Sequence, residues 1–230
     1  MNIFEPDRSA MRLPVSVITG FLGSGKTTIL KHLLAQPGMA DSAVIINEFG
    51  EIGLDHLLVE RLDGETVVLA SGCVCCALRS DLETTLRSLL ARMRKGQIPP
   101  FSRVLVETTG LADPAPICQM LLNNPLVSHF FRLDTLLTAI DALHGAGQLE
   151  QRQEAIKQAA LADRLLLTKV DLVDPASVTA LHTALAALNP GAVRLEVTQG
   201  AVDPGLLFGG SGYDPTTKTR DVQAWLAAPE

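Results

Sequence analysis

The chain has 230 residues, of which 47% are hydrophobic and 19% charged, and its formal net charge is −6. This composition is typical of a globular protein that can bury the core of one α/β domain. The acidic balance argues against nucleic acid or an anionic membrane surface as the main partner. No apolar run approaches the roughly 18 residues of a membrane span. Residues 1–9 lack the apolar core of a signal peptide. We therefore expect a cytoplasmic protein.

Apolar, strand-like runs alternate with helical segments along the chain. This alternation predicts a mostly parallel sheet covered by helices on both sides, a three-layer α/β/α fold. Strands are expected at 14–19, 43–47, 66–70, 103–107, 133–140, 164–168 and 193–197. Helices are expected at 26–36, 78–95, 114–122, 148–160 and 175–188. We expect an N-terminal tail at 1–12, a nucleotide-binding domain at 13–200, and a linker or terminal segment at 201–230, which is rich in Gly and Pro.

The run that begins at Gly20 reads Gly-Phe-Leu-Gly-Ser-Gly-Lys-Thr and fills the phosphate-loop pattern Gly-x-x-x-x-Gly-Lys-Ser/Thr. It lies between a strand-like run and a helical one, as the loop of a P-loop NTPase must. Glycines let backbone N–H groups turn toward phosphate oxygens, and the helix N-terminus adds partial positive charge. Lys26 can reach the β- and γ-phosphates, and the Thr27 hydroxyl can bind Mg²⁺. The expected phosphate-binding residues are Gly20, Gly23, Ser24, Gly25, Lys26, Thr27 and Thr28.

A second phosphate element is expected where the apolar strand at 103–107 ends in an acid. At the carboxyl edge of a parallel sheet, Glu107 would lie beside the phosphate loop, where it can hold the Mg²⁺ shell or orient the attacking water. Gly110 follows three residues later, and its N–H can contact a γ-phosphate. Lys26, Glu107 and Gly110 are therefore the candidate catalytic residues. Strand-end acids are also common at solvated edges, so the prediction depends on the neighbouring phosphate loop.

The segment Thr168-Lys169-Val170-Asp171 resembles the guanine-reading pattern Asn-Lys-x-Asp, with Thr in the place of Asn. The Asp171 carboxylate can accept hydrogen bonds from the N1–H and 2-amino group of guanine, a pair of donors that adenine lacks. The Lys169 stem can pack over the base plane. The Thr168 substitution removes one amide contact, and the alternative is an ordinary strand followed by a Lys/Asp turn.

Three of the four cysteines, Cys73, Cys75 and Cys76, fall within four residues. Three thiolates on one turn can form a site for a soft metal ion, and their spacing differs from that of a zinc ribbon. Cys76 can complete the ligand set or face the core. An open or transient metal site is expected, and redox-active thiols or a packed turn are the alternatives. Cys118 stands alone and is expected in the core.

The segment 47–56 follows the second expected strand, at the position of the first switch in P-loop GTPases. It contains the carboxylates Glu48 and Glu51, His56 and two glycines. It can therefore lie over a nucleotide and also supply metal ligands.

Taken in this order, the motifs over residues 13 to 200 resemble the CobW-like group of P-loop GTPases, relatives of the metallochaperone GTPases of hydrogenase and urease maturation. The resemblance rests on the phosphate loop, 47–55, 71–76, 106–114 and 168–171. It implies GTP hydrolysis with Mg²⁺, coupled to binding and delivery of zinc or cobalt to a client metalloprotein. It also implies that Cys73, Cys75 and Cys76 are the metal thiolates and that Glu48 and Glu51 link metal to nucleotide.

Members of this group usually carry a second, C-terminal domain, and this sequence stops where that domain would begin. No arginine finger is evident, so slow intrinsic turnover is expected. A homodimer is left open. The alternatives are a zinc-binding or thiol-redox regulator that nucleotide only stabilises, and a small-molecule phosphotransferase on the same fold.

Overall fold

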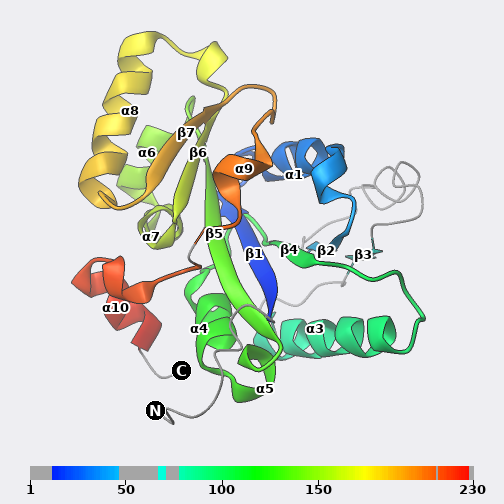
Figure 1. Ribbon diagram of the computed structural model, residues 1–230. Coiled ribbons are helices and arrows are strands. Elements are labelled where there is room, and N and C mark those ends of the chain that lie inside the picture. The colour runs from blue at the N-terminus through cyan, green and yellow to red at the C-terminus, as the bar shows by residue number, and fades with distance from the viewer. Residues whose placement is uncertain (1–11, 47–66, 71–77, 211, 228–230) are drawn as a thin grey trace.

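A computed structural model describes residues 12–46, 67–70, 78–210 and 212–227, and within them one sheet of parallel strands has helices on both faces (Figure 1). The strand order is β3-β2-β4-β1-β5-β6-β7. The prediction of a three-layer α/β/α fold is confirmed, and every expected strand is present with ends within two residues of the expectation. The strands are β1 (Leu13–Gly20), β2 (Ser42–Ile46), β3 (Val67–Ala70), β4 (Arg103–Glu107), β5 (Phe131–Asp141), β6 (Arg164–Thr168) and β7 (Val193–Val197).

The longer helices also follow the expectation, with one difference. The helix expected at 148–160 is two helices, because Arg152 has an extended backbone with φ −124° and ψ 114°. Arg152 is neither Pro nor Gly, so no local signal marks this break. The described helices are α1 (Lys26–Leu34), α3 (Leu78–Arg94), α4 (Ala115–Asn123), α5 (Pro125–Ser128), α6 (Gly145–Gln151), α7 (Gln153–Leu161), α8 (Pro175–Leu188), α9 (Pro204–Leu207) and α10 (Arg220–Ala227), with short 3₁₀ turns at η2 (Pro37–Met39), η3 (Val170–Leu172) and η4 (Pro215–Thr217).

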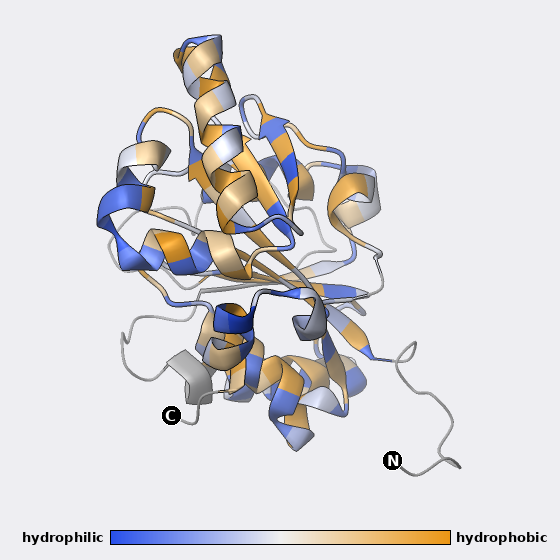
Figure 2. Cartoon of the chain, turned by 90° about the vertical axis from the view of Figure 1, so that its left-hand side faces the viewer, coloured by the Kyte–Doolittle hydropathy of each residue, from blue (hydrophilic) through white to orange (hydrophobic). Residues whose placement is uncertain are grey.

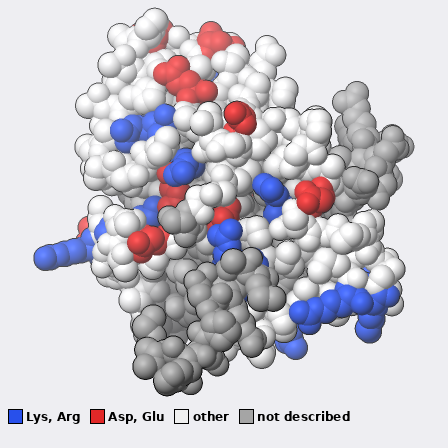
Figure 3. Space-filling model, in the orientation of Figure 1, with Lys and Arg blue, Asp and Glu red and all other residues white. Residues whose placement is uncertain are grey.

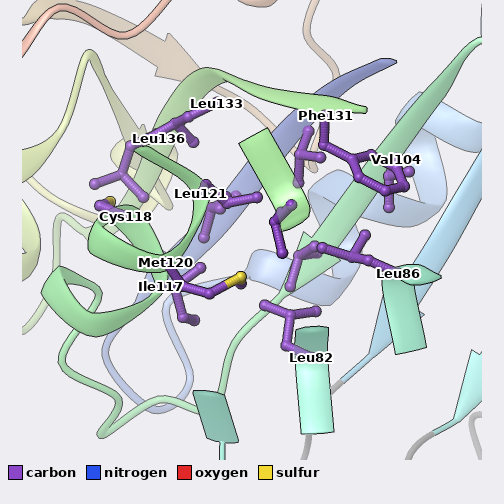
Figure 4. Packing of buried hydrophobic residues seen from close by; sticks show 14 of the residues in the cluster. Leu82, Leu86, Val104, Ile117, Cys118, Met120, Leu121, Phe131, Leu133 and Leu136 are labelled. Atoms are coloured by element: carbon purple, nitrogen blue, oxygen red, sulfur yellow. The ribbon is translucent and has the colours of Figure 1, made fainter. Parts of the chain in front are cut away.

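Strand residues alternate between the two faces of the sheet, and each face is apolar because helices cover both. Figure 2 shows the strands as largely hydrophobic. On one face, α3 and α4 pack against β4 and β5, and Figure 4 shows Leu86 and Met120 among the buried side chains there. On the other face, Leu30 of α1 packs with Leu105 and Leu137. The core therefore has two layers, one on each side of β1, β4 and β5.

The segment after residue 200 packs against both faces of this domain. Leu207 of α9 joins the cluster around α1, whereas Val222 and Leu226 of α10 join the cluster around α4. The amide of Gln119 on α4 donates to the carbonyl oxygen of Trp225 at 2.8 Å. The chain therefore contributes to the domain core beyond the expected boundary at residue 200. Cys118, also on α4, is fully buried as expected, and burial raises the pKa of its thiol.

On the face drawn in Figure 3, acidic side chains lie at the top, acidic and basic side chains are mixed across the middle, and Lys and Arg gather at the lower right over α3. The last turn of α3 carries Arg92 and Arg94, and cations are favourable at a helix C-terminus. In the described part of the chain, no helix combines the length and the apolar character that crossing a membrane requires.

Candidate functional site

The loops that follow β1, β4, β5 and β6 meet at the carboxyl edge of the sheet. The chain runs from β1 across β4 to β2, and later from β4 across β1 to β5, so the direction of the crossovers reverses at β1. In open α/β sheets, ligands bind outside the strand ends at such a reversal. The phosphate loop follows β1 directly and is therefore at this point of the fold.

Left-handed or otherwise unusual glycine conformations shape the phosphate loop. Gly20, Gly23 and Gly25 have φ of 137°, 73° and 91°. A Cβ on Gly20 would lie 2.3 Å from the carbonyl oxygen of Ala139 on β5, so no side chain fits there. Gly25 ends the loop as the N-cap of α1, which leaves the helix N-terminus facing the loop without a side-chain cap. The phosphate-loop sequence therefore has glycine at these positions because of their backbone conformation and, at Gly20, because there is no room for a side chain.

Lys26 lies across the loop that precedes it. Its side chain is largely buried, and Nζ donates to the carbonyl oxygens of Gly20 at 2.8 Å and Phe21 at 3.1 Å. The ammonium group is thus held next to the loop backbone, at the position where the pattern requires a cation for phosphate.

Thr27 and Glu107 come from different elements and meet directly. The Thr27 hydroxyl, at the start of α1, donates to Glu107 Oε1 at 2.6 Å, and Glu107 is 2% exposed at the end of β4. The sequence predicted these two groups beside the phosphate loop, one as a Mg²⁺ ligand and one for its shell. A hydroxyl and a carboxylate are the hard oxygen donors that Mg²⁺ prefers. The donor set therefore fits that ion.

The loop after β4 packs closely on the phosphate loop. The Thr108 N–H donates to the carbonyl oxygen of Ile18 at 3.0 Å, and the Thr108 hydroxyl donates to Thr19 Oγ1 at 2.9 Å. A Cβ on Gly110 would lie 2.6 Å from the backbone nitrogen of Leu22. Gly110 is therefore at the phosphate loop, where the sequence placed it, and only glycine allows so close an approach.

Thr168 ties the base-side loop to the phosphate loop. Its hydroxyl donates to the carbonyl oxygen of Ser24 at 2.8 Å and lies 3.3 Å from the carbonyl oxygen of Ile140. The substitution of Thr for Asn thus keeps a side-chain donor between the two loops, which the sequence did not indicate.

Lys169 is held by an acid that the sequence analysis did not single out. Its backbone is left-handed, with φ 57°, and Nζ contacts Asp141 Oδ2 at 2.7 Å. The same carboxylate accepts from the Leu143 N–H at 2.8 Å and lies 3.1 Å from Nδ1 of His144. Burial alone would raise the pKa of Asp141, but the hydrogen bonds from Lys169, His144 and Leu143 outweigh it and lower that pKa. Asp141 is therefore an anion that orients Lys169.

A pocket of about 270 Å³ lies beside this pair. Five of its lining residues were predicted from the sequence, three for the base side and two for the phosphate loop, and the others come from η3, β7 and the loop after β7. A purine base is a planar group of suitable size for such a pocket. The lining residues are Gly25, Thr28, Thr168, Lys169, Asp171, Leu172, Val197, Gln199 and Gly200.

Leu172, Val197, Gln199 and Gly200 also line this pocket and were missed by sequence reasoning, and the last two shape the loop after β7. Both have positive φ, 51° and 81°, and a Cβ on Gly200 would lie 2.8 Å from the carbonyl oxygen of Thr28. Gly200 therefore needs to be glycine for the loop to approach α1. The available signal was their position, directly after the last expected strand at the same carboxyl edge.

The predicted transition-metal ligands Cys73, Cys75, Cys76, Glu48 and Glu51 lie outside the described residues. Within the described ranges, no group of three His, Cys, Asp or Glu side chains is arranged to hold a metal ion. The roles of these five residues therefore stay predictions.

The fold and the loop geometry define a P-loop nucleotide-binding protein. Residues 14–196 match the family model described as CobW/HypB/UreG, nucleotide-binding domain. The chain therefore belongs to the CobW/HypB/UreG family, as the sequence motifs predicted.

Two relatives of the chain are named as zinc chaperones. The chain is 40% identical over 201 residues to the zinc chaperone YjiA of Escherichia coli K12, a match that covers 87% of this chain and 62% of that protein. It is 30% identical over 236 residues to the zinc chaperone CobW of Pseudomonas aeruginosa, with 89% and 61% covered. The chain thus spans less than two thirds of the length of these relatives.

Solved structures agree on the fold. Zn(II)-bound YjiA GTPase from E. coli superposes with a TM-score of 0.70 at 34% identity, covering 90% of this chain and 65% of that one. HypB from Helicobacter pylori in complex with nickel superposes with a TM-score of 0.59 at 17% identity, covering 86% of this chain and 83% of that one, which supports the fold alone.

Proposed function

We propose that this chain is a GTP-binding and slowly hydrolysing metallochaperone domain, in which the nucleotide state controls the binding and delivery of a transition metal. The observation that best supports the nucleotide-binding part of this proposal is the 2.6 Å contact between the Thr27 hydroxyl and the Glu107 carboxylate beside the phosphate loop. It supports a Mg²⁺-nucleotide site because two hard oxygen donors, one on α1 and one on β4, meet beside the phosphate loop.

Each residue has a separate part in the proposed hydrolysis. Mg²⁺, when bound, neutralises charge on the phosphates. Lys26 stabilises the negative charge that develops on the transferred phosphoryl group, and Glu107 orients the attacking water and would hold the Mg²⁺ shell when the ion is bound. Thr27 would hold the same ion through its hydroxyl oxygen. The Gly110 N–H contacts the γ-phosphate.

Guanine selectivity is assigned to Asp171 and Lys169. The Asp171 carboxylate accepts from N1–H and the 2-amino group, and the Lys169 stem packs on the base while Asp141 holds its ammonium group. The pocket next to these residues supports this assignment, as does the similarity of the chain to the YjiA GTPase of E. coli.

The metal half of the proposal rests on Cys73, Cys75 and Cys76, with Glu48 and Glu51 as the link to nucleotide. Thiolates favour Zn²⁺, and the relatives named zinc chaperones support zinc over cobalt. Metal is cargo in this scheme and passes to a client metalloprotein in the cytoplasm.

A homodimer is also proposed, because Leu22 and Leu111 are more than half exposed beside the phosphate loop, where a second copy can cover them.

Asp171→Asn tests the nucleotide assignment. Asparagine keeps one oxygen that can accept from N1–H, but its amide nitrogen cannot accept from the 2-amino group. Loss of that one bond to a carboxylate costs about 1.5–3 kcal/mol, so we expect affinity for GTP to fall about 10- to 100-fold. Xanthine carries an oxygen in place of the 2-amino group, and the asparagine amide can donate to it. Affinity for xanthosine triphosphate should therefore rise. Competition with a fluorescent GTP analogue measures both.

Asp174→Asn is the matched control, since Asp174 is an exposed N-cap of α8 three residues along the chain. It should bind GTP as the wild type does. Equal binding of GTP and ATP by the wild type, or an Asp171→Asn variant with unchanged base preference, would exclude the guanine site and favour the phosphotransferase alternative.

A further inference from the structure

The loop between β4 and α4 is enclosed on two sides. Its phosphate side is formed by Leu22, which Gly110 approaches so closely that a Cβ would overlap it. The opposite side is formed by α7, whose consecutive residues Lys157 and Gln158 both contact the loop. The loop that carries Gly110 is thus backed by a helix that belongs to neither the phosphate loop nor the base pocket.

Gln158 makes the central contact. Its side chain is almost fully buried, and Nε2 donates to the carbonyl oxygens of Gly110 at 3.2 Å and Ala112 at 2.9 Å. Both neighbours are acceptors, so the nitrogen must be the end that faces them. The amide oxygen is buried without a partner among the described residues. Unpaired buried oxygens reduce stability, so this amide is poorly explained as a purely stabilising contact.

Two further interactions fix the amide relative to the loop. The Thr138 hydroxyl on β5 donates to the backbone oxygen of Gln158 at 2.7 Å, which anchors this turn of α7 to the sheet. Lys157 Nζ contacts Asp113 Oδ2 at 2.6 Å. Lys157 therefore holds the far end of the loop while Gln158 holds its middle.

The contacts also determine the direction of the Gly110 N–H. The Thr109 carbonyl oxygen accepts from the Ala112 N–H at 3.2 Å, and the Thr108 hydroxyl lies 3.2 Å from the same oxygen. In a trans peptide the N–H points opposite to the carbonyl, so the Gly110 N–H points away from these donors. Among the described residues it makes no hydrogen bond. Hydrogen bonds therefore hold the Thr109 carbonyl of this peptide, while the Gly110 N–H is available to bind a phosphate oxygen.

We propose that Gln158 is a positioning residue for the γ-phosphate, acting through the Gly110 loop. This inference rests on the proposed GTP hydrolysis. Gln158 touches no nucleotide group itself. It holds the carbonyls of Gly110 and Ala112, so that the Gly110 N–H stays directed at the γ-phosphate. Loss of the amide should therefore affect GTP, which has a γ-phosphate, and spare GDP, which does not.

Gln158→Met tests the inference, because methionine keeps the unbranched shape and removes the donor. We expect turnover of GTP to fall about tenfold, since a small misplacement of a phosphate contact is costly. The ratio of affinities for a non-hydrolysable GTP analogue and GDP should fall by a similar factor, with GDP affinity itself unchanged. Gln153→Met is the matched control, since it makes the same change at an exposed position of the same helix, away from the Gly110 loop. It should keep the wild-type ratio.

Lys157→Met provides a second variant at a more exposed site, and a smaller fall in the same ratio is expected. If Gln158→Met keeps the wild-type ratio and turnover, or if Gln153→Met lowers the ratio equally, the positioning role is wrong while the GTPase proposal stands. If the wild-type chain hydrolyses no GTP, the proposed function and this inference both fail.

Discussion

Lys26→Ala should reduce GTP turnover by about 100- to 1,000-fold while the domain stays folded. This is the range observed when one preorganised group that stabilises transition-state charge is removed. The folded state should tolerate the change, because the Lys26 ammonium bonds to carbonyls of its own loop and alanine is a strong helix former at the start of α1. Steady-state phosphate release measures turnover, and thermal unfolding measures the fold.

Lys31→Ala is the matched control, because Lys31 is an exposed lysine on the same helix. It should keep wild-type turnover. Unchanged phosphate release by Lys26→Ala, with Lys31→Ala as the reference, would exclude the phosphate loop as the site of hydrolysis.

Glu107→Gln should lower turnover by about 100-fold and raise the Mg²⁺ concentration needed for half-maximal rate. Glutamine keeps an oxygen that can accept from the Thr27 hydroxyl, but it removes the negative charge that attracts the ion and its waters. Replacing a buried carboxylate with a neutral amide of the same shape should leave the free energy of unfolding within about 1 kcal/mol of the wild type. Mg²⁺ titrations of the hydrolysis rate separate the two effects.

Glu196→Gln serves as the control, because Glu196 is an exposed acid on β7 whose ion pair, within the described part of the chain, is with His182. Its Mg²⁺ dependence should match the wild type. A Glu107→Gln variant with normal rate and normal Mg²⁺ dependence would assign Glu107 a structural role at the end of β4.

Most of the fold could be predicted because strong local signals agree with the tertiary structure. The strands are apolar and β-branched, as strands covered on both faces must be, and the phosphate loop marks the junction of β1 and α1. The break at Arg152 had no such signal. It comes from packing, since α7 turns Ala155, Gln158 and Ala159 into the core.

The candidate site was predictable where a short motif carries it. Thr27 and Glu107 are 80 positions apart, yet each ends or begins an element at the same sheet edge, so their meeting could be expected. Asp141 was missed because the expected strand stopped one residue before it. Gln158 lies inside an ordinary amphipathic helix, and only the tertiary structure places its amide behind the Gly110 loop.

The coupling of metal to nucleotide is the central claim, and a Zn²⁺ titration against a chromogenic competitor tests it most directly. The titration is run with Mg²⁺ and a non-hydrolysable GTP analogue, and again with Mg²⁺ and GDP, on the wild type and on Cys75→Ser. Stoichiometric zinc that binds at least about tenfold more tightly with the GTP analogue, and is weakened by Cys75→Ser without loss of nucleotide affinity, is the predicted result. Equal zinc affinity in both nucleotide states would contradict the account and leave Cys73, Cys75 and Cys76 as redox or structural thiols.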